Sequence, residues 1–371
     1  MPLNLRIPGP TPCPPDVLEA MSHEMINHRG PEFTTTQKRL TELLQKYFQT
    51  KNDVYIVSAS GTGVMETMVV NALSPGDRVL AVSIGAFGDR FARIAEIFGA
   101  DVKRLNFEWG ETADPDAIRR ELQADPSIKA VLVTHNETST GVTNPLGEIA
   151  KAVKEFDKLI LVDAISSLSS IHCPVDEWQL DFVGTGSQKG WMVPPGISMV
   201  SVSAKGWEAY EQSKMPKLYF DLGQYRTYGE KGEPPWTPAL SCYFALDKAF
   251  EILEREGLQA ILDRHQRLAD KTRAGVKQLG FQLVPVEERY ASNTVTAAYP
   301  PEGVEPGKLI AYCRDELGVE FQGGQGKLAG KIIRIGHLGL VSESDIDLSL
   351  DALGRGLSAL GYSREALAAN A

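Results

Sequence analysis

Short apolar runs alternate with amphipathic segments along the first half of the chain. The runs that predict strands span 54–57, 78–82, 130–134, 159–163, 182–184 and 197–202. Between them, apolar positions at helical spacing predict helices at 63–73, 89–98, 114–122, 146–156 and 205–213. Strands separated by helices of this length indicate βαβ crossovers, so we expect an α/β fold whose mostly parallel sheet is flanked by helices on both faces.

The pattern changes toward both ends of the chain. Segments 15–25 and 34–48 predict two early helices, and 214–235, with Gly, Pro and three tyrosines, predicts a long irregular connection. The last part predicts helices within 239–279, at 307–317 and at 343–360, and strands at 281–284, 294–298 and 331–335. We therefore expect an N-terminal arm at 1–20, a large domain at 21–254 and a smaller C-terminal α+β domain at 255–371.

Composition and charge restrict the partners of this protein. The 371 residues are 43% hydrophobic and 23% charged, with a net charge of −10, as in an ordinary acidic globular protein. We expect neither nucleic-acid nor membrane binding, because no basic cluster offsets this charge. The four cysteines form no CxxC pair, so we expect no metal site. Without an apolar run suited to a signal peptide or a membrane span, a cytoplasmic location is the default.

Two polar residues follow apolar runs in the segment 159–190. Asp163 ends one run, and Lys189 follows the next within Gly-Ser-Gln-Lys-Gly. Side chains at the carboxyl ends of parallel strands face one crevice, where α/β sheets bind ligands. An acid and a lysine there suit pyridoxal phosphate (PLP), because the amine forms a Schiff base while the carboxylate keeps the pyridine nitrogen protonated. For an isolated pair, an Asp163 that caps a turn and a Lys189 that is a solvated loop residue would be the better interpretation.

A small-residue loop, Ser58-Ala59-Ser60-Gly61-Thr62-Gly63, joins a predicted strand to a predicted helix. Its glycines allow close backbone approach, and the free N–H groups at a helix start suit a phosphate. The alternative is a loop chosen for packing alone. The loop matches neither a P-loop nor GxGxxG, which disfavours a nucleotide.

Three more features carry candidate chemistry. The segment 133–141 follows a strand and is rich in hydroxyls that could bond a ring oxygen or a carboxylate, or satisfy their own backbone. Phe87 follows another strand and could stack on an aromatic ring or lie in the core. Arg334 lies between isoleucines in a predicted strand and suits a carboxylate clamp if its face looks across the crevice.

Five motifs in this order, SASGTGVMET, THNETSTG, LVDAISS, GSQKG and KIIRIG, resemble class V PLP-dependent aminotransferases of fold type I. The resemblance is closest to the alanine/serine–glyoxylate aminotransferases. It extends from Pro8-Gly9-Pro10 to the last predicted helix, nearly the whole chain. It implies a homodimer with active sites at the interface.

The resemblance implies a role for individual residues. Lys189 matches the Schiff-base lysine, Asp163 the partner of the pyridine nitrogen, and Phe87, often Trp in relatives, the stacking residue. The other implied cofactor contacts are Ser60, Gly61, Thr62 and Gln188 at the phosphate, Thr138 at the ring hydroxyl, Ile165 against the ring, and Thr237 from the other subunit. The expected substrate contacts are Arg334, Gly9 and Arg29.

The expected reaction moves the amino group of a small amino acid to a small 2-oxo acid. The resemblance suggests alanine or serine as the donor and glyoxylate as the acceptor. An aspartate donor would want a second cation, which Arg29 or Arg226 could supply. A PLP lyase such as a cysteine desulfurase is the second alternative, but Gln188 replaces the desulfurase His and 321–327 holds no Cys. A non-catalytic binding module or a nucleotide-dependent oxidoreductase is the third.

Overall fold

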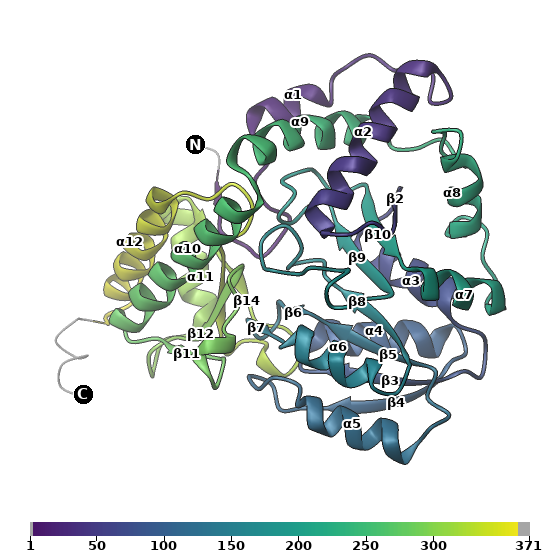
Figure 1. Ribbon diagram of the computed structural model, residues 1–371. Coiled ribbons are helices and arrows are strands. Elements are labelled where there is room, and N and C mark those ends of the chain that lie inside the picture. The colour runs from purple at the N-terminus through teal and green to yellow at the C-terminus, as the bar shows by residue number, and fades with distance from the viewer. Residues whose placement is uncertain (1–2, 363–371) are drawn as a thin grey trace.

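A seven-stranded sheet forms the centre of the larger lobe of the computed structural model, which describes residues 3–362 (Figure 1). The strands lie in the order β2-β10-β9-β8-β5-β3-β4. Only β10 is antiparallel to its neighbours. Their bounds are β2 (Asp53–Val57), β3 (Arg78–Ser83), β4 (Asp101–Asn106), β5 (Ala130–Thr134), β8 (Leu159–Asp163), β9 (Phe182–Gly186) and β10 (Ser198–Val202). The predicted α/β class with a mostly parallel sheet is confirmed.

Helices cover both faces of this sheet. Successive residues of a strand point to opposite faces, and in the central strands the residues on both faces are apolar. In β5, Ala130 and Leu132 pack into one core, whereas Val131 and Val133 pack into the other. The first core contains helices α3 (Gly61–Ala72), α4 (Ala86–Ile97), α7 (Ala204–Gln212) and α8 (Leu222–Gly229). The second contains α2 (Pro31–Phe48), α5 (Pro115–Ala124), α6 (Leu146–Lys154) and α9 (Leu240–Glu256).

A four-stranded antiparallel sheet forms the smaller lobe, in the order β11-β12-β15-β14. Its strands are β11 (Gln282–Leu283), β12 (Val295–Tyr299), β14 (Gln322–Gly323) and β15 (Ile333–Gly336). Its helices are α10 (Leu258–Gln278), α11 (Pro306–Leu317), α12 (Glu343–Ala359) and the 3-10 turns Glu288–Tyr290 and Gly326–Leu328. The α+β character agrees with the prediction, while the boundary between 254 and 255 stays a prediction. Parts of the predicted arm, 1–2, and of the predicted small domain, 363–371, lie outside the described residues.

The N-terminal segment connects the two lobes. Strand β1 (Asn4–Leu5) pairs with β13 (Val319–Glu320) of the smaller lobe. Beyond it, Thr11 donates from its backbone N–H to the carbonyl of Gln188 in the larger lobe at 3.0 Å. The short helix α1 (Pro15–Ala20) then packs against α9. The hairpin β6 (Asn136–Glu137) and β7 (Val142–Thr143) projects from the end of β5.

Three sequence predictions of local structure were wrong. The segment 101–106 forms strand β4, which was missed because an edge strand with exposed polar residues has no apolar run. The connection 214–235 contains α8, whose only buried residues are Leu222 and Tyr225. The helix expected at 15–25 ends at Ala20, because the exposed residues that follow offer no apolar face to the core. No helix within 3–362 is long and apolar enough to cross a membrane.

Candidate functional site

The carboxyl ends of β5, β8 and β9 bring the candidate residues together. Thr134 is the register partner of Asp163, and Asp163 is the partner of Gly184. Ile165 follows Asp163 by two residues, and Lys189 lies three residues beyond the end of β9. The acid and the lysine therefore both lie at the carboxyl ends of the central strands.

Asp163 is a buried carboxylate with few partners. Its Oδ1 accepts from the backbone N–H of Ile165 at 2.9 Å, and its Oδ2 accepts from Thr134 Oγ1 at 3.4 Å. Burial, helped by the charge of Glu137, raises the pKa of Asp163 to about 7, although the hydrogen bonds and Lys189 act to lower it. Oδ2 thus has only one long hydrogen bond, and the carboxyl group titrates close to neutral pH.

Lys189 is held by the N-terminal arm. Its Nζ donates to the carbonyl of Pro8 at 2.5 Å, and Thr11 Oγ1 donates to the carbonyl of Lys189 at 3.0 Å. Burial, helped by the charges of Arg334 and Arg90, lowers the pKa of Lys189 to about 8, although Asp163 acts to raise it. A substantial share of the amine is therefore neutral near pH 8.

Gly9 explains why the arm can approach the lysine so closely. Its φ is +132°, and a Cβ there would lie 2.5 Å from Lys189 Nζ. Any side chain at this position would meet both backbone strain and the amine.

The N-terminus of α3 forms the predicted phosphate end of the site. Ser60 is the N-cap residue, yet its side chain makes no capping hydrogen bond, so the first N–H groups of the helix are not satisfied by it. A Cβ on Gly186 would lie 2.9 Å from Gln188 Oε1 and 3.5 Å from the Cα of Gly61, which brings Gln188 to this helix start. Gln188 Oε1 is buried and lacks a hydrogen-bond partner. The uncapped N–H groups suit a phosphate, whereas the unpaired Gln188 Oε1 is an acceptor, so only the NH₂ of this amide could donate to one.

The walls of the site come from other segments. Phe87, half-buried, is the second residue of α4. Ile165 approaches Gly61 so closely that a Cβ on the glycine would lie 2.8 Å from Ile165 Cδ1. Thr138 follows β6 and donates through Oγ1 to Ser166 Oγ at 2.9 Å. These three residues are the ones that the sequence predicted to contact the cofactor ring.

Arg334 reaches the site from β15 of the smaller lobe. Its Nε donates to the carbonyl of Gly323 at 2.8 Å and its Nη1 to the carbonyl of Thr138 at 3.2 Å, so the guanidinium bridges the two lobes. Burial lowers the pKa of Arg334 to about 10, which leaves it charged at neutral pH. Within residues 3–362 its Nη2 donates to no group and remains able to bind a carboxylate.

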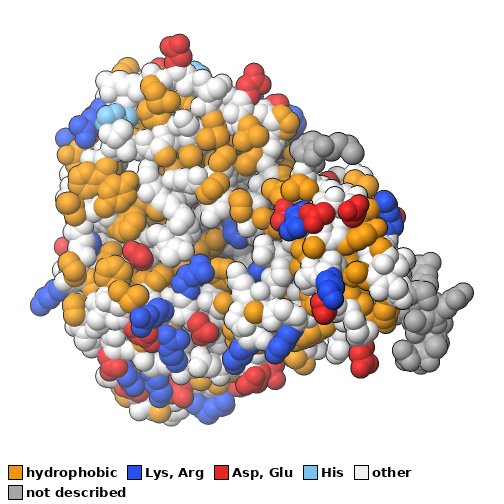
Figure 2. All heavy atoms as spheres, turned by 180° about the vertical axis from the view of Figure 1, so that it is seen from behind, with side chains coloured by type: hydrophobic (Ala, Val, Ile, Leu, Met, Phe, Trp, Pro, Cys, Tyr) orange, Lys and Arg blue, Asp and Glu red, His pale blue; other side chains and the backbone are white. Residues whose placement is uncertain are grey.

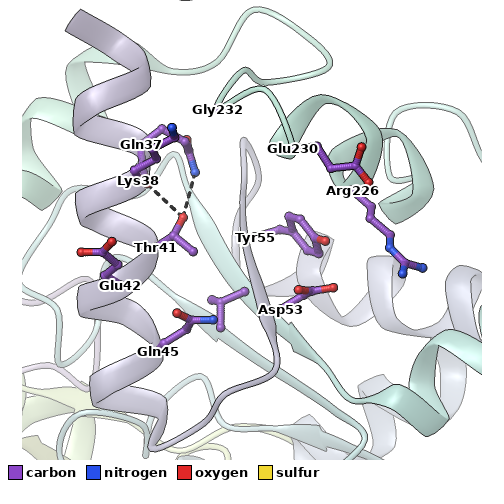
Figure 3. A pocket seen from close by; sticks show the side chains of 12 residues that line it. Gln37, Lys38, Thr41, Glu42, Gln45, Asp53, Tyr55, Arg226, Glu230 and Gly232 are labelled. Carbon is purple, nitrogen blue, oxygen red and sulfur yellow. Dashed lines mark hydrogen bonds between the residues drawn. The ribbon is translucent and has the colours of Figure 1, made fainter. Parts of the chain in front are cut away.

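Three predicted residues lie elsewhere in this single chain. Thr237 is exposed ahead of α9, and Arg29 Nη2 donates to the carbonyl of Pro235 at 3.4 Å. Arg226 lines a separate cavity of about 420 Å³ between α2, β2 and α8 (Figure 3). Its guanidinium lies 4.6 Å from the ring centre of Trp207. None of these contacts connects the three residues to Lys189 or Arg334.

Sequence reasoning missed two charged side chains and one backbone group at the site. Arg90 lies over the ring of Phe87 at 4.8 Å and donates to Thr62 Oγ1 at 3.4 Å. Glu137 is fully buried and bonds the first turn of α4. Arg90 follows Phe87 at a helical spacing of three residues, but the predicted helix at 89–98 began after Phe87, so the pair was not recognised. The carbonyl of Pro8 has no side-chain signal.

Comparisons with known proteins show which family the chain resembles over most of its length. The model of a family described as aminotransferase class-V matches residues 4–337. A protein of Synechococcus sp. named soluble hydrogenase, small subunit, is 44% identical over 97% of this chain and 94% of its own length. The serine–glyoxylate aminotransferase of Methylorubrum extorquens is 36% identical over 92% of this chain and 87% of its own.

Two further proteins are similar over most of their length. The L-aspartate–glyoxylate aminotransferase of Paracoccus denitrificans is 35% identical over 91% of this chain and 87% of its own. The crystal structure of an alanine–glyoxylate aminotransferase from Nostoc sp. superimposes with a TM-score of 0.92 at 31% identity, covering 96% of each chain.

Proposed function

The chain belongs to the class-V aminotransferase family, and we propose that it transfers the amino group of alanine or serine to a small 2-oxo acid such as glyoxylate. PLP is the cofactor of this family. The observation that carries the proposal is the convergence of Lys189, Asp163 and Arg334, a buried amine, acid and guanidinium, at one edge of the sheet. The choice of a small donor and acceptor rests on the glyoxylate aminotransferases among the relatives.

The residues present fit a phosphorylated pyridine ring. The uncapped start of α3 would hold the phosphate, with Gln188 donating through its amide NH₂, and Asp163 Oδ2 would hold the ring nitrogen. Phe87 and Ile165 would cover the two faces, and Thr138 Oγ1 would bond the ring hydroxyl. When bound, the protonated ring of the cofactor stabilises negative charge that develops at the substrate Cα.

Lys189 moves the proton in this proposal. Its pKa of about 8 leaves enough neutral amine to accept the proton from the substrate Cα, and the resulting ammonium returns it on the product side. The carbonyl of Pro8 receives an N–H of the amine and fixes its direction. The burial of the lysine under the arm excludes water that would compete for the proton.

Arg334 orients the substrate. Nε and Nη1 are fixed by the carbonyls of Gly323 and Thr138, so Nη2 is preorganised for the α-carboxylate. The bond from Nη1 to Thr138 also ties this orientation to the residue that contacts the ring.

Aspartate as amino donor is a second candidate. Arg90 is a further cation close enough to lower the pKa of Lys189, and the relative from Paracoccus denitrificans is named for aspartate. Arg90 could receive the side-chain carboxylate of such a donor. Hydrogen activation, suggested by the name of the Synechococcus relative, has no supporting cluster: no three His, Cys, Asp or Glu side chains within 3–362 are placed to hold a metal.

Amino-group transfer measured for alanine, serine and aspartate against glyoxylate, pyruvate and 2-oxoglutarate tests the proposal. We expect the highest kcat/KM for alanine or serine with glyoxylate. The Lys189→Ala variant should lose at least about 1,000-fold in kcat, because proton transfer has no other amine. Faster turnover of aspartate would favour the second candidate, and no transfer with any pair would reject both.

A further inference from the structure

Glu137 is a buried carboxylate for which the proposed reaction has no direct use. It is 0% exposed, and all four of its hydrogen bonds are accepted. Oε2 accepts from the backbone N–H groups of Phe87 and Gly88, each at 3.0 Å. Oε1 accepts from the N–H of Ser139 at 3.0 Å and from its Oγ at 2.6 Å. The three backbone N–H groups can only donate, so they favour the ionised carboxylate, whereas the Ser139 hydroxyl can either donate or accept.

The space around this carboxylate is closely fitted. A Cβ on Gly85 would lie 2.4 Å from Glu137 Cγ and 2.5 Å from Ser139 Oγ. The 12-residue helix α4 points its N-terminus at Oε2, where its dipole favours a negative charge. Gly85 before α4 leaves the space that the Glu137 side chain occupies, and Ser139 supplies two of its hydrogen bonds.

This carboxylate joins three segments that line the site. Through Oε2 it fixes the backbone of Phe87, and through Oε1 it fixes the turn that begins at Thr138. The carbonyl of Thr138 receives Nη1 of Arg334, and Thr138 Oγ1 donates to Ser166 in the loop after Asp163. A shift of Glu137 would therefore move the ring-stacking residue, the ring-hydroxyl residue and the substrate guanidinium relative to one another.

The charge of Glu137 also acts on the site. Burial raises the pKa of Glu137 above its ordinary value, and the hydrogen bonds from Ser139, Gly88 and Phe87 offset this only in part. Its negative charge raises the pKa of Asp163 and, against the effect of burial, that of Arg334. One carboxylate thus influences both the acid at the ring nitrogen and the cation at the substrate.

We propose, on the basis of the proposed function, that Glu137 is a positioning residue that keeps Phe87 and Thr138 in register with Arg334 and supplies the negative field at the cofactor ring. The Glu137→Gln variant keeps the shape but not the charge. Its amide nitrogen cannot accept hydrogen bonds, so either the α4 pair or the Ser139 pair of donors loses its acceptor.

Titration of the apoprotein with PLP, followed by absorbance, tests this role apart from turnover. We expect Glu137→Gln to raise the Kd for PLP about 10- to 100-fold, as one or two unsatisfied buried donors imply. The midpoint of the pH-dependent absorbance of the bound cofactor should fall by about 0.5–1 pH unit, because loss of a nearby negative charge destabilises a protonated group. The Ser139→Ala variant keeps the charge, so it should raise the Kd about 3- to 10-fold and leave the midpoint in place.

Asp181 provides the matched control. It is a buried carboxylate just before β9, at the end of the strands opposite to the site. It accepts from Lys154 Nζ at 2.5 Å and from the N–H of Ile160 at 2.9 Å. Asp181→Asn should lower the melting temperature of the apoprotein while the Kd for PLP stays within twofold of wild type.

The outcomes separate the two proposals. Wild-type protein that does not bind PLP would contradict the proposed function itself. Wild-type binding with an unchanged Kd and midpoint in Glu137→Gln would overturn the role of Glu137. If Glu137→Gln does not fold, Ser139→Ala decides, because a Kd within twofold of wild type in that variant would also overturn it.

Discussion

Burial alters the acid–base chemistry of Asp163 and Lys189 before any ligand is present. The pKa of the acid rises to about 7 and that of the amine falls to about 8, each chiefly because burial disfavours its charged form. Both groups therefore exchange a proton with solvent close to neutral pH, so each is present in both its protonated and its deprotonated form. This suits an amine that must accept a proton and an acid that must bond a ring nitrogen, and it costs stability in the cofactor-free protein.

That cost gives a prediction for Asp163→Asn. An aspartate whose folded pKa lies above its unfolded value of about 3.9 binds more protons in the folded state, so its unfavourable contribution grows as pH rises from about 4 to 7 and is complete above pH 7. The Asp163→Asn apoprotein should be more stable than wild type at pH 7.5, by at most about 4 kcal/mol. Urea unfolding at pH 7.5 and pH 4 measures this. A variant less stable than wild type at pH 7.5, or an advantage that persists at pH 4, would contradict it.

The residues at the site differ in how visible they are in the sequence. Asp163 and Lys189 follow apolar strands, so their position at one edge could be predicted from pattern and chemistry. Glu137 could not, because its partners lie 49 and 50 residues away in α4 and nothing in its neighbourhood distinguishes a buried carboxylate from a solvated one. The contact from Lys189 to Pro8 is made by a backbone carbonyl, and it depends on how the arm crosses between the lobes.

At the scale of elements, predictability followed burial. Strands β5 and β8 are buried throughout and were predicted with their observed bounds. Strand β4, at the sheet edge, alternates between exposed and partly exposed residues and has no apolar run. Hairpin β6–β7 has two residues in each strand, and its role in linking the lobes comes from tertiary contacts such as that of Asn136 Nδ2 with Thr294 Oγ1 at 3.0 Å.

Two buried histidines join the elements of the smaller lobe. His337, after β15, contacts Thr296 Oγ1 in β12 at 2.9 Å and the carbonyl of Asn293 at 3.1 Å. His265 in α10 accepts from the N–H of Gly339 at 3.2 Å. Burial lowers the pKa of each to about 3, so both imidazoles are neutral in the folded protein.

These histidines predict a pH-dependent stability. The unfolded chain binds a proton at each below about pH 6.5 and the folded chain does not until about pH 3, so stability falls as pH falls through this window. Each contributes about 1.4 kcal/mol per pH unit. His337→Gln should remove one such contribution between pH 6 and 4 in urea unfolding, whereas replacement of the exposed His23 by Gln should keep the wild-type slope. An unchanged slope in His337→Gln would exclude this cause.

At the scale of the whole molecule, the arm makes the position of the lobes part of the site. The N–H of Gly336, two residues after Arg334, donates to the carbonyl of Arg6 at 2.6 Å, and a Cβ on Gly336 would lie 2.1 Å from the carbonyl oxygen of Ile7. Four residues beyond Ile7, Thr11 holds the Lys189 loop. Lysine and arginine are thus spaced by one strip of backbone, which the sequence showed only as a segment rich in Pro and Gly.

Exposed apolar side chains on the larger lobe are relevant to the predicted homodimer. Figure 2 shows hydrophobic side chains gathered on the upper part of the larger lobe, while charged side chains crowd its lower part. Leu218 is 72% exposed and Tyr219 44%, and the ring of Tyr219 stacks on Trp236, beside Thr237, at 6.3 Å. An exposed apolar group next to a residue expected to serve another subunit favours an interface between copies of this chain.

We therefore predict that Leu218→Glu weakens self-association, because a charge placed in an apolar interface loses its hydration. Sedimentation should show a dimer for wild type and a shift toward monomer for the variant, with weaker PLP binding if Thr237 completes the site of the partner. Leu348→Glu is the control, since Leu348 is 55% exposed on α12 of the smaller lobe, away from this surface. A monomeric wild type that transfers amino groups would contradict the dimer, and a fully dimeric Leu218→Glu would place the interface elsewhere.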